Sequence, residues 1–305
     1  MNTIMRNIVV SVLVIALVLV GVYVFQNKKP TKNSSTRNEQ IQKILVTASF
    51  YPYAYLVQEV GKDLVEVVSL TPPGVEAHDF EPTAKDITQI EKSSLFVLNG
   101  GGVEEYEENI RQVYEGKELR IVALGENYMK GRDPHVWLDP VIMGKMSVDL
   151  ANILSTVNPE YSTKFMEYAT EFQNKMAALD SELQKSLVSC KKDTIFTAHT
   201  AFGYLADRYG FKQVGIAGIH PEEEPSAQEL GEIAKEIQKV GARYVLLEEM
   251  APTKFSEILA EETGATLLVL SPIESIVQEE LKEGESYFTK QQSNIRTLKT
   301  ALECL

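Results

Sequence analysis

The sequence of this 305-residue chain predicts an α/β protein of two lobes, each with a mostly parallel sheet, joined by a long rigid helix. Short apolar runs alternate with segments of helical spacing from residue 43 to about residue 140, and again from 191 to 305. Between these regions, residues 141–190 show helical periodicity and no strand pattern. Strands that alternate with helices form parallel sheets covered on both faces. We therefore expect lobes at 43–140 and 191–305 and a helical linker at 141–190.

Apolar, often β-branched runs bounded by polar residues or glycine predict the strands of the first lobe. These strands are expected at 44–49, 64–70, 95–99 and 120–124. Residues with helical spacing lie between them and predict helices at 53–61, 84–92 and 104–114. Gly61 is a typical helix stop at the end of the first of these helices.

The linker is expected to contain one long helix at 160–187, which would extend roughly 40 Å at 1.5 Å per residue. The sequence Val-Asn-Pro-Glu at 157–160 separates it from an earlier helical segment. The β/α alternation then predicts strands at 194–197, 213–217, 244–248 and 266–270. A capping box formed by Ser226 and Glu229 opens a predicted helix at 226–240.

The N-terminal region contains an almost uninterrupted apolar run from Ile8 to Phe25. Its length just reaches that of a membrane span, and it does not end in the small residues of a signal-peptide cleavage site. Residues 1–25 are therefore expected to form a membrane anchor, with a cleaved signal as the alternative. The polar segment 26–42 is expected to be a flexible tether.

Charge and cysteine content restrict the possible partners and the compartment. The first 38 residues hold five of the 30 basic residues and no acidic residue, so the remainder carries a net charge of −18. Such an acidic surface argues against nucleic acid as a partner. Cys190 and Cys304 are the only cysteines, and they form either a disulfide or two free buried thiols.

Three of the four histidines lie in polar, turn-rich segments about sixty residues apart. His78, His135 and His199 each follow a predicted strand or precede a predicted helix, where open α/β sheets bind their ligands. Neutral imidazole is the commonest protein ligand for zinc and related ions. The carboxylates Asp133 and Asp139 flank His135 and are expected to orient it. Because two histidines belong to the first lobe and one to the second, we expect a metal site in the cleft between the lobes.

Several dispersed motifs give the chain a specific resemblance to a known family. They are EAHDFEP at 76–82, DPHVWLDP at 133–140, AHTAFGY at 198–204 and EPSA at 224–227. From about Lys43 onward, the sequence resembles the metal-binding solute-binding proteins of ABC importers for zinc and manganese. The resemblance implies two α/β lobes bridged by a long rigid helix, with the metal held between them.

The resemblance also implies a fourth ligand in a loop after a late strand of the second lobe. The sequence has Ser271 where manganese-type members carry an aspartate, and Glu274 where zinc-type members carry a glutamate. The implied ligands are therefore His78, His135, His199 and Glu274, a set that suits Zn²⁺, although Mn²⁺ is possible. His220 matches no ligand position and is expected to be a loop residue, with a weak auxiliary ligand as the alternative.

The implied function is capture of a metal ion outside the cytoplasm and its delivery to an ABC permease by a monomeric protein that is not an enzyme. This location requires an outward-facing anchor or a secreted protein, whereas basic residues after the apolar run favour the opposite orientation. A manganese- or iron-binding member of the same family is the nearest alternative. Further alternatives are a secreted zinc hydrolase, with Glu76 or Glu274 as general base, and an adhesin on the same scaffold. The hydrolase is disfavoured because the sequence lacks a His-Glu-x-x-His motif.

Overall fold

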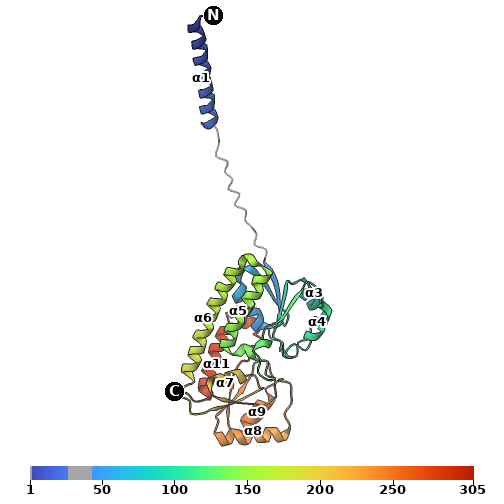
Figure 1. The fold of residues 1–305 in the computed structure, drawn as a ribbon. Coiled ribbons are helices and arrows are strands. Elements are labelled where there is room, and N and C mark those ends of the chain that lie inside the picture. The colour runs from blue at the N-terminus through green and yellow to red at the C-terminus, as the bar shows by residue number, and fades with distance from the viewer. Residues whose placement is uncertain (1, 27–42) are drawn as a thin grey trace. The chain divides into compact units, whose positions relative to one another are not determined.

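A computed structural model describes residues 2–26 and 43–305 of the chain (Figure 1). The chain divides into two units, Met1–Ile41 and Gln42–Leu305. The first unit contains helix α1, Thr3–Gln26. A membrane crossing needs about 20 consecutive apolar residues. Among the described residues no helix is both long and apolar enough for one, so the predicted membrane-spanning anchor is not supported. The predicted tether at 26–42 lies, from residue 27 onward, outside the described residues.

The second unit begins with a four-stranded parallel sheet in the order β2-β1-β3-β4. Its strands are β1 Ile44–Ala48, β2 Val65–Ser69, β3 Leu95–Leu98 and β4 Arg120–Ala123. Val46 in the central strand β1 pairs with Val67 on one side and with Leu95 on the other. The helices of this lobe are α2 Tyr51–Gly61, α3 Ala84–Lys92 and α4 Glu107–Tyr114. Helix α4 begins three residues later than predicted: Glu104 lies in a turn, where its side chain accepts hydrogen bonds from the backbone N–H groups of Asn99 and Gly100.

Two helices follow the first sheet, α5 Pro140–Val157 and α6 Ser162–Ser186. Buried apolar residues of α6 recur at helical spacing, beginning with Phe165, Ala169 and Phe172. This stripe packs against three helices: α5, α2 in the first lobe, and the C-terminal helix α11, Tyr287–Ala301. Figure 1 shows α6 running from the first lobe to the second. At 25 residues it extends about 37 Å, close to the predicted helix.

The second sheet repeats the first, with four parallel strands in the order β6-β5-β7-β8. Its strands are β5 Thr194–Thr197, β6 Lys212–Gly215, β7 Tyr244–Leu247 and β8 Thr266–Val269. The remaining helices are α7 Gly203–Tyr209, α8 Ala227–Val240, α9 Lys254–Thr263 and α10 Gln278–Glu283. Short 3-10 turns lie at Lys62–Leu64, Glu126–Tyr128, Val136–Leu138 and Pro159–Tyr161. The two-lobed α/β fold class is thus confirmed, whereas the boundaries at 43–140, 141–190 and 191–305 stay a prediction.

The end of the chain is tied back to the start of the second sheet. Cys190, before β5, and Cys304, after α11, form a disulfide that joins positions 114 residues apart. Helix α11 therefore has a covalent attachment at its C-terminal end, and its side chains reach the loops described below.

Candidate metal centre

The structure brings together four residues that lie beyond the carboxyl ends of parallel strands. His78 follows β2, His135 follows β4, His199 follows β5 and Glu274 follows β8. All four are buried, and one donor atom from each lies within 4.8 Å of the others. Two donors come from segments of the first lobe and two from the second. The spacing of the histidines predicts two from the first lobe and one from the second, and the family resemblance adds Glu274.

The donor atoms have the separations of a small coordination shell. Nε2 of His135 and Nε2 of His199 are 3.2 Å apart. Glu274 Oε1 lies 3.7 Å from Nε2 of His78, 3.6 Å from Nε2 of His135 and 3.8 Å from Nε2 of His199. Ligands of a tetrahedral Zn²⁺ ion, with bonds near 2.0–2.1 Å, are about 3.3 Å from one another. The four groups therefore fit a single tetrahedral cation with small adjustments.

Two of these side chains have polar atoms that no protein group satisfies. Within the described residues, both ring nitrogens of His78 and both carboxylate oxygens of Glu274 are buried without a hydrogen-bond partner. Burial, with the charge of His135, lowers the pKa of His78 to about 3, and burial followed by the charge of Glu76 raises the pKa of Glu274 well above its usual value. Buried polar groups without partners cost free energy. A bound cation would satisfy one ring nitrogen of His78 together with the carboxylate of Glu274.

Asp133 orients His135, as expected. Its Oδ1 lies 2.8 Å from His135 Nδ1 and accepts a 3.0 Å hydrogen bond from the His135 backbone N–H. This directs Nε2 of His135 toward the other donors. A Cβ atom on Gly203 would clash with Asp133 Oδ2, so glycine at the start of α7 lets this carboxylate keep its position beside His135. Burial raises the pKa of Asp133 to about 6.

Glu248 has the same role for His199 and was missed from the sequence. Its Oε2 lies 2.6 Å from His199 Nδ1, and its Oε1 accepts a 3.1 Å hydrogen bond from the His199 backbone N–H. Glu248 follows β7, the neighbour of β5, so the pair lies where the strand order of the second sheet reverses. Burial lowers the pKa of His199, but the charge and hydrogen bond of Glu248 outweigh it, and the pKa is raised overall.

We expect Glu248→Gln to weaken metal binding about 10- to 100-fold, as is typical when a carboxylate behind a ligand histidine is lost. Glutamine keeps the size of the side chain but removes the charge that favours donation by Nδ1 of His199. The measurement is a competition titration of Zn²⁺ against a chelator of known affinity. Glu261→Gln, an exposed residue of α9, is the matched control. Equal affinities in the two variants would contradict the role of Glu248.

Asp139 does not take the predicted place beside His135. Its Oδ1 accepts hydrogen bonds from the backbone N–H groups of Val141 and Ile142, so it caps α5. Its Oδ2 lies 2.6 Å from Nε of Arg208 on α7. The Asp-Pro sequence is typical of an N-cap followed by the first helical residue, which explains this role. Asp139 therefore links the linker helix to the second lobe.

The loop that carries Glu274 is held by side chains from two other segments of the chain. The Asn294 side chain on α11 accepts a hydrogen bond from the Ser271 N–H and donates one to the Ser271 carbonyl. Trp137 Nε1 donates a 2.8 Å hydrogen bond to the Pro272 carbonyl. Ile273 has a φ angle of 58°, which a β-branched residue rarely adopts. The protein thus maintains a strained backbone next to Glu274.

His220 approaches the site without belonging to the four-residue group. Its ring packs edge-on against His78, with the ring centroids 5.2 Å apart. Its place in a loop between β6 and α8 agrees with the sequence interpretation.

Comparison with known proteins gives a consistent result. A family model described as "Zinc-uptake complex component A periplasmic" matches residues 46–301. The chain is 31% identical over 287 residues to the zinc-binding protein AdcA of Streptococcus pyogenes serotype M1, covering 84% of this chain. It is 32% identical over 293 residues to the high-affinity zinc uptake system protein ZnuA of Bacillus subtilis, covering 88% of this chain and 92% of that protein. A solved structure of the Zn(II)-bound ZnuA-like domain of Streptococcus pneumoniae AdcA has a TM-score of 0.77 and 31% identity, covering 86% of this chain and 99% of that one.

The streptococcal AdcA relative is longer than this chain. The match covers 56% of its length, so the alignment compares this chain with a part of that protein.

Proposed function

Because this chain belongs to the zinc-uptake complex component A family, we propose that it is an extracytoplasmic protein that binds one Zn²⁺ ion and delivers it, as a monomer, to an ABC permease. The proposed ligands are His78, His135, His199 and Glu274. The observation that carries the proposal is the convergence of four buried donors, two from each lobe, at separations that suit a tetrahedral ion.

The donor set supports zinc over manganese as the proposed cargo. Imidazole suits zinc, whereas sites rich in carboxylates and water suit manganese. Three of the four donors here are imidazoles, and Ser271, the residue that would correspond to an aspartate of manganese-type members, instead hydrogen-bonds to Glu249.

The same donor set disfavours the hydrolase alternative. Catalytic zinc sites keep one position open for water or substrate, whereas four protein ligands close the shell. Such a centre holds an ion and does not activate a water molecule on it. Family membership also argues for transport, since the family is described as a component of zinc uptake.

We expect the purified protein to bind one Zn²⁺ per chain and to become more stable on binding. A ligand that binds only the folded state adds about 2.7 kcal/mol to the free energy of unfolding at 100 times its Kd. The measurements are calorimetric titration of metal-free protein and thermal melting with and without zinc. Absence of zinc binding near neutral pH would reject the proposed function, and preferential binding of Mn²⁺ in competition would reject the choice of metal.

We expect zinc binding to release protons and to weaken on acidification. The raised pKa values of His199 and Glu274 mean that these groups carry protons in the metal-free protein at higher pH than usual, and Zn²⁺ must displace them. His78, with its pKa near 3, contributes no proton at neutral pH. Calorimetry in buffers of different ionisation enthalpy at pH 6.5 should report about one to two protons released per Zn²⁺. Zero release would contradict the assigned ligands.

A further inference from the structure

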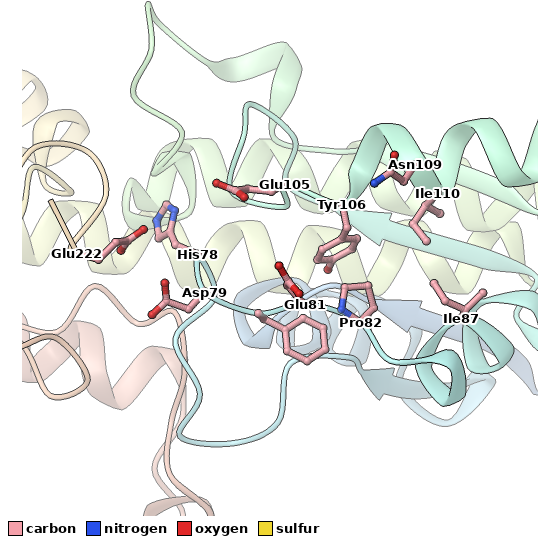
Figure 2. A pocket seen from close by; sticks show the side chains of 11 residues that line it. His78, Asp79, Glu81, Pro82, Ile87, Glu105, Tyr106, Asn109, Ile110 and Glu222 are labelled. Atoms are coloured by element: carbon pink, nitrogen blue, oxygen red, sulfur yellow. The ribbon is translucent and has the colours of Figure 1, made fainter.

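A cavity of about 610 Å³ opens beside the metal centre (Figure 2). Its wall comes mainly from the segment after β2, the turn before α4, and α4 itself, while Glu222 comes from the loop after β6 in the second lobe. In Figure 2, His78, Asp79 and Glu222 lie toward one end of the cavity and Ile87, Asn109 and Ile110 toward the other. The metal centre thus adjoins one end of a cavity to which both lobes contribute.

The ionisable groups of this cavity are nearly all acidic. Four carboxylates line it, those of Asp79, Glu81, Glu105 and Glu222, and its lining contains no lysine or arginine. All four residues are exposed, and none of them forms a salt bridge within 2–26 and 43–305. Their charges therefore act together on the cavity and are not cancelled by a neighbouring cation.

His78 connects the acidic cavity to the buried metal centre. It lines the cavity, yet its side chain is only 1% exposed. Both of its ring nitrogens lack a hydrogen-bond partner in the described part of the chain. A buried nitrogen that can bind a cation therefore lies at the end of the cavity near Asp79 and Glu222. Figure 2 shows the Glu222 carboxylate directed toward the His78 ring. An ion that enters here meets exposed carboxylates first and an unpaired imidazole next.

We infer that this acidic cavity is the entry path by which a hydrated divalent cation reaches the buried centre, an inference that rests on the proposed function. Exposed carboxylates attract the hydrated ion and raise its local concentration without binding it tightly. Exchange of water for imidazole then begins at His78, and the ion proceeds to the remaining three donors. The cavity thereby controls the rate of loading, while the four donors determine the final affinity.

The test is the association rate constant for Zn²⁺, measured by stopped flow against a fluorescent chelator at low and high ionic strength. The test variant is Glu81→Gln/Glu105→Gln, which removes two cavity charges and no proposed ligand. The control is Glu261→Gln/Glu262→Gln, which makes the same change in net charge on exposed residues of α9, outside the cavity lining. We expect the cavity variant to load about tenfold more slowly at low salt, with the difference shrinking at high salt, and the control to match the wild type.

The outcomes separate the entry path from the proposed function. Equal slowing in both double variants would show an effect of net charge alone and would overturn the entry path. Unchanged loading in both variants would also overturn it while leaving zinc binding intact. If the wild-type protein bound no Zn²⁺, the proposed function and the entry path would both be rejected. Melting temperatures of the metal-free variants identify any change caused by misfolding, and in that case the single variant Glu105→Gln repeats the comparison.

Discussion

Replacing His78 by alanine is expected to lower zinc affinity by more than about 100-fold, because losing a ligand removes more than the 10- to 100-fold effect of losing its supporting partner. His78 is the cleanest of the three histidines to test. His135 and His199 are held by Asp133 and Glu248, so their removal would also break the hydrogen bonds from the rings to these carboxylates. The ring of His78 makes no hydrogen bond within the described residues, so its loss breaks none.

The matched control is His220→Ala, since the ring of His220 packs against His78 but lies outside the four-residue group. We expect the control to bind zinc with nearly wild-type affinity and both variants to melt, without metal, close to the wild-type temperature. Competition titration against a chelator gives the affinities. If the two variants were weakened equally, His220 would have to be counted among the ligands; if neither were weakened, the proposed centre would be wrong.

Removal of the disulfide is expected to lower the free energy of unfolding by about 2–5 kcal/mol, the usual cost of losing a native cross-link. The bond between Cys190 and Cys304 closes a loop with a sequence separation of 114, and such long loops restrict the unfolded chain strongly. Urea unfolding of Cys190→Ser/Cys304→Ser against the oxidised wild type measures the loss.

Reductant supplies an internal control for this experiment, because the structure contains no free cysteine. Reduction should lower the urea midpoint of the wild type to that of the double variant and should leave the double variant unchanged. An oxidised wild type that unfolds at the same urea concentration as the double variant would contradict the expected stabilisation.

Most of the fold could be predicted because its strands are short apolar runs and its helices carry their own boundary residues. The helix α8 is an example, since Ser226 and Glu229 form the capping box that the sequence indicates. Helix α4 was placed too early because helical spacing alone does not show that Glu104 lies in a turn and accepts hydrogen bonds from the backbone N–H groups of Asn99 and Gly100.

The three histidines could be identified from the sequence because each lies in a polar, turn-rich segment beside a predicted strand or helix. Glu274 could be identified only through the resemblance to a family. Glu248 was missed because it and Glu249 look like two surface acids. Glu248 is buried directly after β7 while Glu249 is exposed, but Val245 and Leu246 of β7 are both buried, so alternation along the strand does not distinguish the two acids. The pairing of Glu248 with His199 depends on the order of strands in the sheet, which local sequence does not show.

Helix α11 has a consequence for when the centre becomes functional during synthesis. Three of its side chains hold the ligand loops: Tyr287 and Gln291 donate to the carbonyls of Trp137 and Leu138, and Asn294 holds Ser271. All four proposed ligands are synthesised before this helix. A chain that contains all four proposed ligands but has not yet folded α11 therefore lacks the hydrogen bonds that hold their loops. We expect such a chain to bind the ion more weakly than the completely folded protein.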